Sequence, residues 1–321
     1  MLASGLLALA VWLNRDEVRE VLSHRPNGRY YALAFGLYLL GVLLAYTRWF
    51  LLVRAVGIPF RPIDALRLGL IGTLFNLVIP GAVGGDFVKA AALCKERPGW
   101  KTQAIASIVI DRLLGLMGLF LLAAAAGAWS WGTLDRGIRN VVLVAWIALG
   151  VTAILLVLAF SIHPDGPITR RLGRRKRPSR LIAELHLTGE AYRRHFGVVV
   201  LGVILAAITH SGNVLAFSAI SHALFPETAL PSLAEHFMIV PIVLFSTAIP
   251  LPFGALGATE QISASLFRLT SYGGGAVAMM GFRTLQYLGA SIGAVVYAVN
   301  RQQVRDLTRT ARRLAAEPIE P

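Results

Sequence analysis

Residues 62–95 read PIDALRLGLIGTLFNLVIPGAVGGDFVKAAALCK, an apolar stretch broken in its middle by Ile79-Pro80-Gly81 and Gly84-Gly85-Asp86. Proline and glycine interrupt helices, and the stretch is too short for two complete transmembrane helices and a loop. Irregular backbone at membrane depth is tolerated only where protein or a water-filled cavity surrounds it. The stretch therefore predicts a re-entrant hairpin of two broken helices within a larger membrane protein.

The composition of the whole chain agrees with a membrane protein. The 321 residues are 56% hydrophobic and only 15% charged, with a formal net charge of +14, whereas soluble domains carry about 25% charged residues. This excludes a disordered protein, a soluble nucleic-acid binder and a secreted disulfide scaffold. The single cysteine, Cys94, cannot form an internal disulfide, and the sequence indicates no metal or cofactor site.

Long apolar stretches predict an all-α integral membrane protein with about six full transmembrane helices. A second broken stretch, 231–271, is interrupted by prolines and glycines and predicts a second re-entrant hairpin. The stretch 1–14 is short for a span, at about 1.5 Å per residue, and we interpret it as a short or truncated first helix. The six expected helices cover residues 1–14, 29–55, 101–129, 137–162, 197–222 and 275–299.

The distribution of basic residues predicts the orientation, because cytoplasmic loops are enriched in Lys and Arg. The segment 163–196 is strongly basic and predicts a cytoplasmic interfacial segment on anionic lipid, and the tail 301–321 is also expected in the cytoplasm. Both termini are then cytoplasmic, in the plasma (inner) membrane. The flanks of the first hairpin agree with this orientation through their basic residues, which are Arg48, Arg54, Arg61, Arg67, Lys89, Lys95, Arg97 and Lys101.

The order of elements predicts an inverted repeat within one transmembrane domain, 1–321. Each half, 1–130 and 137–300, contains two helices, a broken hairpin and a helix, and the halves start on opposite sides of the membrane. The hairpins align at Phe75–Pro80 and Phe245–Pro250. Inverted repeats whose broken helices meet near the midplane are typical of secondary transporters.

Ionisable residues inside these spans predict a polar site, because each costs at least about 2.5–3.5 kcal/mol in a membrane. We expect Arg112 and Arg283 to bind a phosphate. The three acids Asp86, Asp111 and Glu260 would balance these arginines or bind a cation. Backbone N–H groups after Gly84-Gly85 and Gly257, at the starts of helices, should favour an anion. Lys89 lies one turn after Asp86, which predicts an i,i+3 pair. The candidate substrate-binding residues are Asn76, Pro80, Gly84, Gly85, Asp86, Lys89, Asp111, Arg112, Pro250, Gly254, Gly257, Glu260 and Arg283.

A purely structural role for these residues stays open. Asp111 with Arg283, and Glu260 with Arg112, are the ion pairs that would hold helices together across the two halves. Asn76 precedes the first break and could satisfy carbonyl groups that the break frees.

The run Asn76-Leu-Val-Ile-Pro80-Gly-Ala-Val-Gly84-Gly85-Asp86-Phe-Val-Lys89, followed by Asp111-Arg112-Leu-Leu-Gly115, resembles the transmembrane domain of lysylphosphatidylglycerol synthase/flippase proteins. The run from Pro250 to Glu260, followed by Arg283, extends the resemblance to nearly the whole chain. Ala82 and Ala255 stand where that family usually has glycine. The resemblance implies movement of a lipid headgroup between leaflets. It does not imply lysyl transfer, which belongs to a separate soluble domain in the bifunctional relatives.

The leading hypothesis is a flippase-like transporter that moves a phospholipid or lipid-linked headgroup, and is not an enzyme. Two alternatives remain, a membrane enzyme acting on a lipid (di)phosphate and a non-transporting accessory subunit of a cell-envelope lipid pathway. The expected partners are membrane lipids, anionic or carrying a lipid-linked phosphate, and no nucleic acid; a second copy of the chain or a cell-envelope biosynthesis protein stays open. Replacing Arg112 or Arg283 with alanine is expected to abolish lipid handling, and replacing Arg174 to have little effect.

Overall fold

The computed structural model describes residues 9, 11–23, 25–79, 83–97, 99–161, 180–225, 230–248 and 255–300. Within these ranges the chain is helical and contains no β-strand. Four helices are long and apolar enough to cross a membrane, and they are α3 (Gly28–Ala55), α6 (Lys101–Trp129), α7 (Arg136–Phe160) and α10 (Phe196–Leu224). The protein is therefore an all-α membrane protein, as the sequence predicts, while the total of six spans stays a prediction.

Both apolar stretches that the sequence predicts to be broken consist of two shorter helices. The first contains α4 (Pro62–Val78) and α5 (Gly84–Glu96), and the second contains α11 (Leu233–Ser246) and α13 (Ala258–Phe267). Pro62 occupies the first turn of α4, where its missing N–H costs nothing. Gly257 precedes α13 with φ at 85°, a left-handed conformation that suits glycine. Pro80, Pro250 and Gly254 lie outside the described residues.

The remaining elements begin and end close to the expected positions. The last helix, α14, is Gly275–Val299, the short η2 (Trp131–Thr133) joins α6 to α7, and η3 (Arg268–Thr270) follows α13. Two short helices are α2 (Arg15–Ser23), which the sequence did not predict, and α9 (Arg180–Arg194) in the basic segment. Most of the expected helix 1–14, residues 162–179 (including Arg174) and the tail 301–321 lie outside the described residues.

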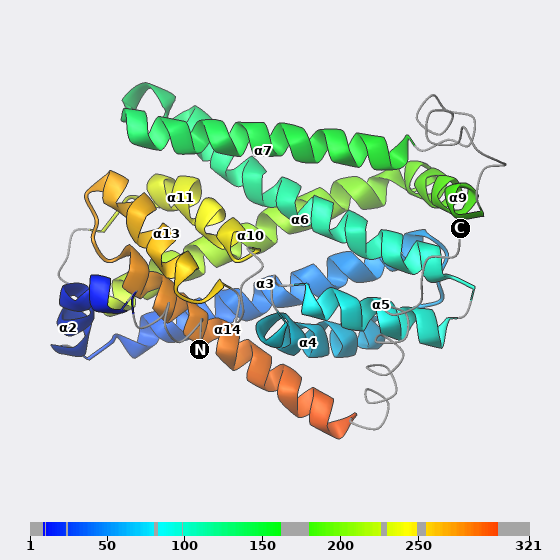
Figure 1. The fold of residues 1–321 in the computed structure, drawn as a ribbon, viewed down its shortest axis with the longest axis horizontal. Helices are drawn as coiled ribbons and strands as arrows, with labels where there is room; N and C mark the ends of the chain where they lie inside the picture. The colour runs from blue at the N-terminus through cyan, green and yellow to red at the C-terminus, as the bar shows by residue number, and fades with distance from the viewer. Residues whose placement is uncertain are drawn as a thin grey trace.

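The long helices run along the length of the molecule, and the two broken pairs lie toward opposite ends of it (Figure 1). The α4–α5 pair lies toward the end that carries α9, and the α11–α13 pair lies toward the end that carries α2. Helices α3 and α10 pack extensively against each other. The last helix of each half packs on the broken pair of the other half, α6 on α11 and α14 on α4.

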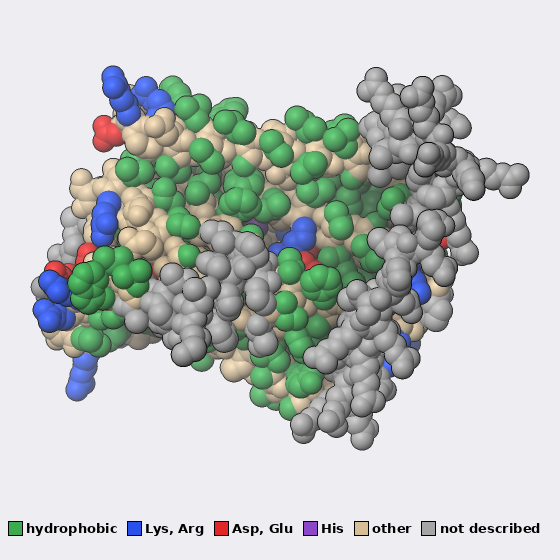
Figure 2. Space-filling view, in the orientation of Figure 1, with side chains coloured by type: hydrophobic (Ala, Val, Ile, Leu, Met, Phe, Trp, Pro, Cys, Tyr) green, Lys and Arg blue, Asp and Glu red, His purple; other side chains and the backbone are tan. Residues whose placement is uncertain are grey.

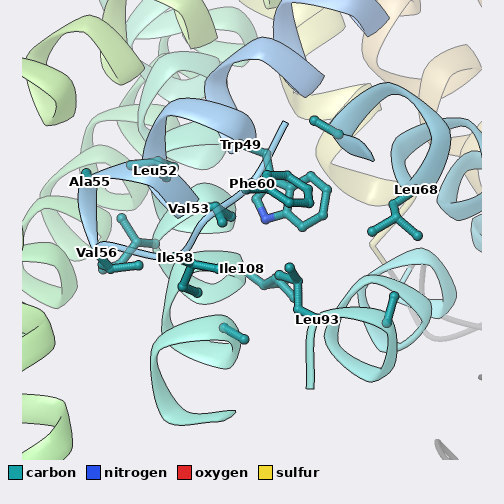
Figure 3. Packing of buried hydrophobic residues seen from close by; sticks show 14 of the residues in the cluster. Trp49, Leu52, Val53, Ala55, Val56, Ile58, Phe60, Leu68, Leu93 and Ile108 are labelled. Carbon is teal, nitrogen blue, oxygen red and sulfur yellow. The ribbon is translucent and has the colours of Figure 1, made fainter. Parts of the chain in front are cut away.

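Two apolar cores hold these elements together. One surrounds Trp49 and Phe60, whose ring centroids are 5.2 Å apart, and draws on α3 to α6 (Figure 3). The other surrounds Phe217, which stacks on Phe267 at 5.5 Å, and draws on α10, α11, α13 and α14. Apolar side chains also cover much of the outer face along α6 and α7 (Figure 2), as expected of surfaces that face lipid.

Candidate functional site

Asp86, in the first turn of α5, contacts two cations. Arg112 of α6 donates a hydrogen bond from Nε to Oδ2 of Asp86 at 2.5 Å. The Nζ atom of Lys89 lies 3.9 Å from the other carboxylate oxygen, so the predicted i,i+3 pair is present. Lys89 Nζ also lies 4.8 Å from the centre of the Trp49 ring, a distance at which the aromatic face attracts a cation.

A second ion pair joins α3 to α6. Arg48 donates from Nε to Oδ1 of Asp111 at 2.7 Å, and both side chains are largely buried. The basic residues predicted to flank the first hairpin include Arg48. The structure packs Arg48 inside the helix bundle, where it is 6% exposed.

These two ion pairs line one cavity of about 280 Å³. Figure 2 shows basic, acidic and histidine side chains in a hollow midway along an otherwise apolar face. Three cations and two carboxylates line the cavity, which leaves one positive charge in excess when histidine is neutral. The polar lining residues are Arg48, Asp86, Lys89, Asp111, Arg112, His210, Asn213, Thr247 and Gln286.

The Arg112 side of the cavity carries exposed side chains. The Arg112 side chain is 44% exposed although it lies within α6. Val109, one turn earlier on α6, and Phe87, next to Asp86 on α5, are both more than half exposed. Phe245 lines the cavity and is also exposed. Charged groups at the opening therefore lie beside exposed apolar side chains.

Glu260 and Arg283 form a separate ion pair that does not line this cavity. Arg283 donates from Nε to Oε1 of Glu260 at 2.5 Å, and the two side chains are 3% and 0% exposed. The predicted pairs of Asp111 with Arg283 and of Glu260 with Arg112 were therefore wrong. In each half, the acid near the start of the second broken helix instead contacts the arginine of the helix that follows.

Two of the backbone N–H groups expected to favour an anion donate to side chains instead. The N–H of Gly85 donates to Oδ1 of Asn76 at 2.8 Å, and the N–H of Gly257 donates to Oε2 of Glu260 at 2.6 Å. Asn76 thus accepts from an N–H at the start of α5, whereas the sequence suggested a role in satisfying carbonyl groups. Both contacts cap helix N-termini, and the contact of Gly85 with Asn76 also joins α5 to α4.

The structure brings Asp86, Lys89, Asp111 and Arg112 together at the cavity. It also places there five polar residues that were not among the predicted site residues, Arg48, His210, Asn213, Thr247 and Gln286. A histidine in the middle of the longest stretch without Asp, Glu, Lys or Arg was a signal that could have identified His210. Among the described residues, no three His, Cys, Asp or Glu side chains gather so that they could hold a metal ion.

Comparison with known proteins places this architecture in a family. The family model described as "Lysylphosphatidylglycerol synthase TM region" matches residues 1–294. A UPF0104 membrane protein of Methanothermobacter thermautotrophicus is 25% identical over 285 residues, 82% of each chain. A UPF0104 membrane protein of Pyrococcus horikoshii is 26% identical over 155 residues, 48% of this chain and 44% of its own length. The chain belongs to the lysylphosphatidylglycerol synthase transmembrane-region family.

Proposed function

We propose that the protein is a flippase-like transporter that moves a phospholipid or lipid-linked headgroup between leaflets through the charged cavity. The observation that carries the proposal is the cavity itself, in which five charged side chains gather among membrane-spanning helices. Charges inside a membrane protein are costly, and they usually mark pathways for polar substrates.

The size of the cavity favours a headgroup over a whole lipid. At about 280 Å³ the cavity lies near the lower limit of small-molecule pockets, about 300 Å³. A headgroup fits in such a volume, whereas a phospholipid with two acyl chains does not. The acyl chains therefore stay in the bilayer while the headgroup enters.

The opening beside Arg112 supports entry of an amphipathic molecule from the bilayer. The headgroup would contact Arg112, and the acyl chains would lie along the exposed side chains of Phe87 and Val109.

A difference between the two halves supports alternate opening. The Asp86–Arg112 pair is partly exposed at a cavity, whereas the Glu260–Arg283 pair, at the corresponding place in the other half, is sealed. If the halves form an inverted repeat, the opposite conformation would expose Glu260 and Arg283 and bury Asp86 and Arg112. Broken helices of inverted repeats commonly alternate in this way around a central site.

The proposal extends to orientation and partners. We place the protein in the plasma (inner) membrane with both termini in the cytoplasm, because the basic segment 163–196 and the tail 301–321 follow the positive-inside rule. In the described part of this segment, α9 packs on α6 and α7, and the Tyr192 hydroxyl donates to the carbonyl of Leu52 at 3.2 Å. The direct partners are membrane lipids with a phosphate in the headgroup.

Reconstitution into vesicles tests the proposal. The purified protein is inserted into phospholipid vesicles that carry a trace of phospholipid fluorescently labelled in the headgroup, and dithionite is added outside to quench accessible label. The wild-type protein should make inner-leaflet label accessible, and Arg112→Ala should not. Arg54→Ala is the matched control, because Arg54 is an exposed arginine in the last turn of α3, away from the cavity.

Two results would overturn the proposal. Wild-type vesicles could protect the inner-leaflet label as well as protein-free vesicles do, or Arg112→Ala could move lipid as fast as the control variant. Mass spectrometry of the same vesicles shows whether the lipid is chemically altered, and hydrolysis without movement would favour a membrane enzyme instead.

A further inference from the structure

We propose that Arg48, a residue outside the broken helices, binds a single monoanionic phosphodiester in the cavity. The inference deepens the proposed function and rests on it, because it names the ligand chemistry of the same cavity. It adds Arg48 to Arg112 as an anion-binding residue and leaves out Arg283, which the sequence favours.

The guanidinium group of Arg48 has only part of its hydrogen-bonding capacity in use. Its Nε donates to Asp111, while its buried Nη1 has no hydrogen-bond partner among the residues that the structure describes. Arg48 is 6% exposed and lines the cavity. A buried donor of this kind costs free energy until a partner satisfies it, and a planar guanidinium suits the oxygens of a phosphate.

A glycine of α6, Gly115, leaves space for the guanidinium group of Arg48. A Cβ atom added at Gly115 would be 3.3 Å from Nη2 of Arg48, closer than about nine in ten real Cβ contacts. Gly115 also lines the cavity, so the absent side chain keeps the guanidinium open to it.

His210 supplies a second polar atom to the same cavity. It stands at the middle of α10, about 20 Å from either end at 1.5 Å per residue. Its Nδ1 is buried and has no hydrogen-bond partner within the described part of the chain. The ring is also hydrogen-bonded to the backbone of Gly115, so in the neutral imidazole Nδ1 is an acceptor and does not donate to a phosphate oxygen.

The charges of the lining select a monoanion. With His210 neutral, Arg48, Lys89 and Arg112 exceed the two carboxylates by one positive charge. A phosphodiester carries one negative charge and balances the cavity, whereas a phosphate monoester, with a second negative charge, would exceed it. Arg283 takes no part in this balance, since it is sealed against Glu260.

Equilibrium binding to the purified protein in detergent tests the inference with three probes. They are a dioctanoyl phosphatidylmethanol, whose headgroup is a bare phosphodiester, dioctanoylglycerol, which lacks phosphate, and inorganic phosphate. The wild type should bind the phosphodiester lipid about tenfold or more tightly than dioctanoylglycerol, as expected for a buried charged hydrogen bond. The double variant Arg48→Gln/Asp111→Asn removes both charges of that pair together and should lose this preference, while Arg54→Gln should keep it.

Gel filtration and thermal unfolding check that each variant is folded. If the double variant is not folded, Gly115→Ala, which leaves the Arg48–Asp111 pair in place, should reduce the preference severalfold, because the added Cβ would lie 3.3 Å from Nη2 of Arg48. A folded double variant, or a folded Gly115→Ala, that keeps the full preference overturns the inference.

The assignment also fails if the wild type shows no preference for the phosphodiester lipid. The wild type could move labelled lipid while the double variant keeps its preference for the phosphodiester lipid. This result would refute the assignment of phosphodiester binding to Arg48 and leave the proposed function standing. Binding of inorganic phosphate without lipid movement would keep the anion site and refute the proposed function.

Discussion

Replacing Arg283 with methionine should separate the structural role of the Glu260–Arg283 pair from any role in transport. The substitution removes the charge that faces a fully buried carboxylate and keeps a side chain of similar length. Among the described residues, the one hydrogen bond that Glu260 would retain comes from the N–H of Gly257, at 2.6 Å. A buried carboxylate without its cation is a strongly destabilising arrangement.

The expected magnitude follows from this burial. Removing one partner of a buried ion pair costs about 3–5 kcal/mol, a large part of the roughly 5–15 kcal/mol that stabilises a typical protein. The double variant Glu260→Gln/Arg283→Met removes both charges, and the glutamine oxygen can still accept from Gly257. We expect the free energy of unfolding of the double variant to lie within about 1 kcal/mol of that of the wild type, because apolar replacement of a buried ion pair is often neutral.

Reversible unfolding in SDS, followed by circular dichroism, measures the wild type, both single variants and the double variant as a double-mutant cycle. If the single variants had free energies of unfolding within about 1 kcal/mol of the wild type, an unpaired buried charge would not be destabilising here, and the reasoning would be refuted. The cycle also matters for transport experiments. If Arg283→Ala lost lipid handling, the loss could result from destabilised folding and would not by itself show a role in transport. A double variant that folds and moves lipid would show that the pair is structural.

Three further predictions rest on single contacts. Arg112→Ala should lower the free energy of unfolding in SDS by at most about 1 kcal/mol, because the arginine is 44% exposed, yet it should slow lipid movement at least tenfold in the vesicle assay. Gly85→Ala should destabilise the protein by about 1–3 kcal/mol or more, because the added Cβ would lie 2.3 Å from the carbonyl oxygen of Gly72. The control is Gly36→Ala, where an added Cβ has nothing within 4 Å. Equal thermal stability of the two variants would contradict the packing of Gly85 against Gly72. Ser232→Ala should cost about 1 kcal/mol through loss of the N-cap of α11, measurable by SDS unfolding, and no change would show that this cap is dispensable.

The residue pattern predicted the helices well because helix formation in a membrane depends on local composition. The expected spans 101–129 and 275–299 match α6 and α14 at both ends, and 29–55 differs from α3 by one residue. The breaks were predictable for the same reason, since glycine and proline act on the backbone where they stand. Helix α2 was missed because it is short and mostly charged, whereas the sequence was searched for long apolar stretches.

The charged partners were not predictable in this way. The sequence singled out Asp86, Asp111, Arg112, Glu260 and Arg283 because their charge is costly in a membrane, but it paired them across the two halves, whereas each pair that forms lies within one half. Arg48 looked like a flanking charge until the packing of α3 against α10 placed it inside the bundle.

Composition and local breaks determined, from the sequence alone, that this chain is a helical membrane protein with buried charges near two interrupted helices. Only the tertiary structure decided that Arg48 and His210 share a cavity with Asp86 and Arg112, and that Glu260 and Arg283 do not. The physical reason is that a span is specified by about twenty consecutive residues, whereas the partner of a buried charge is set by how distant helices pack.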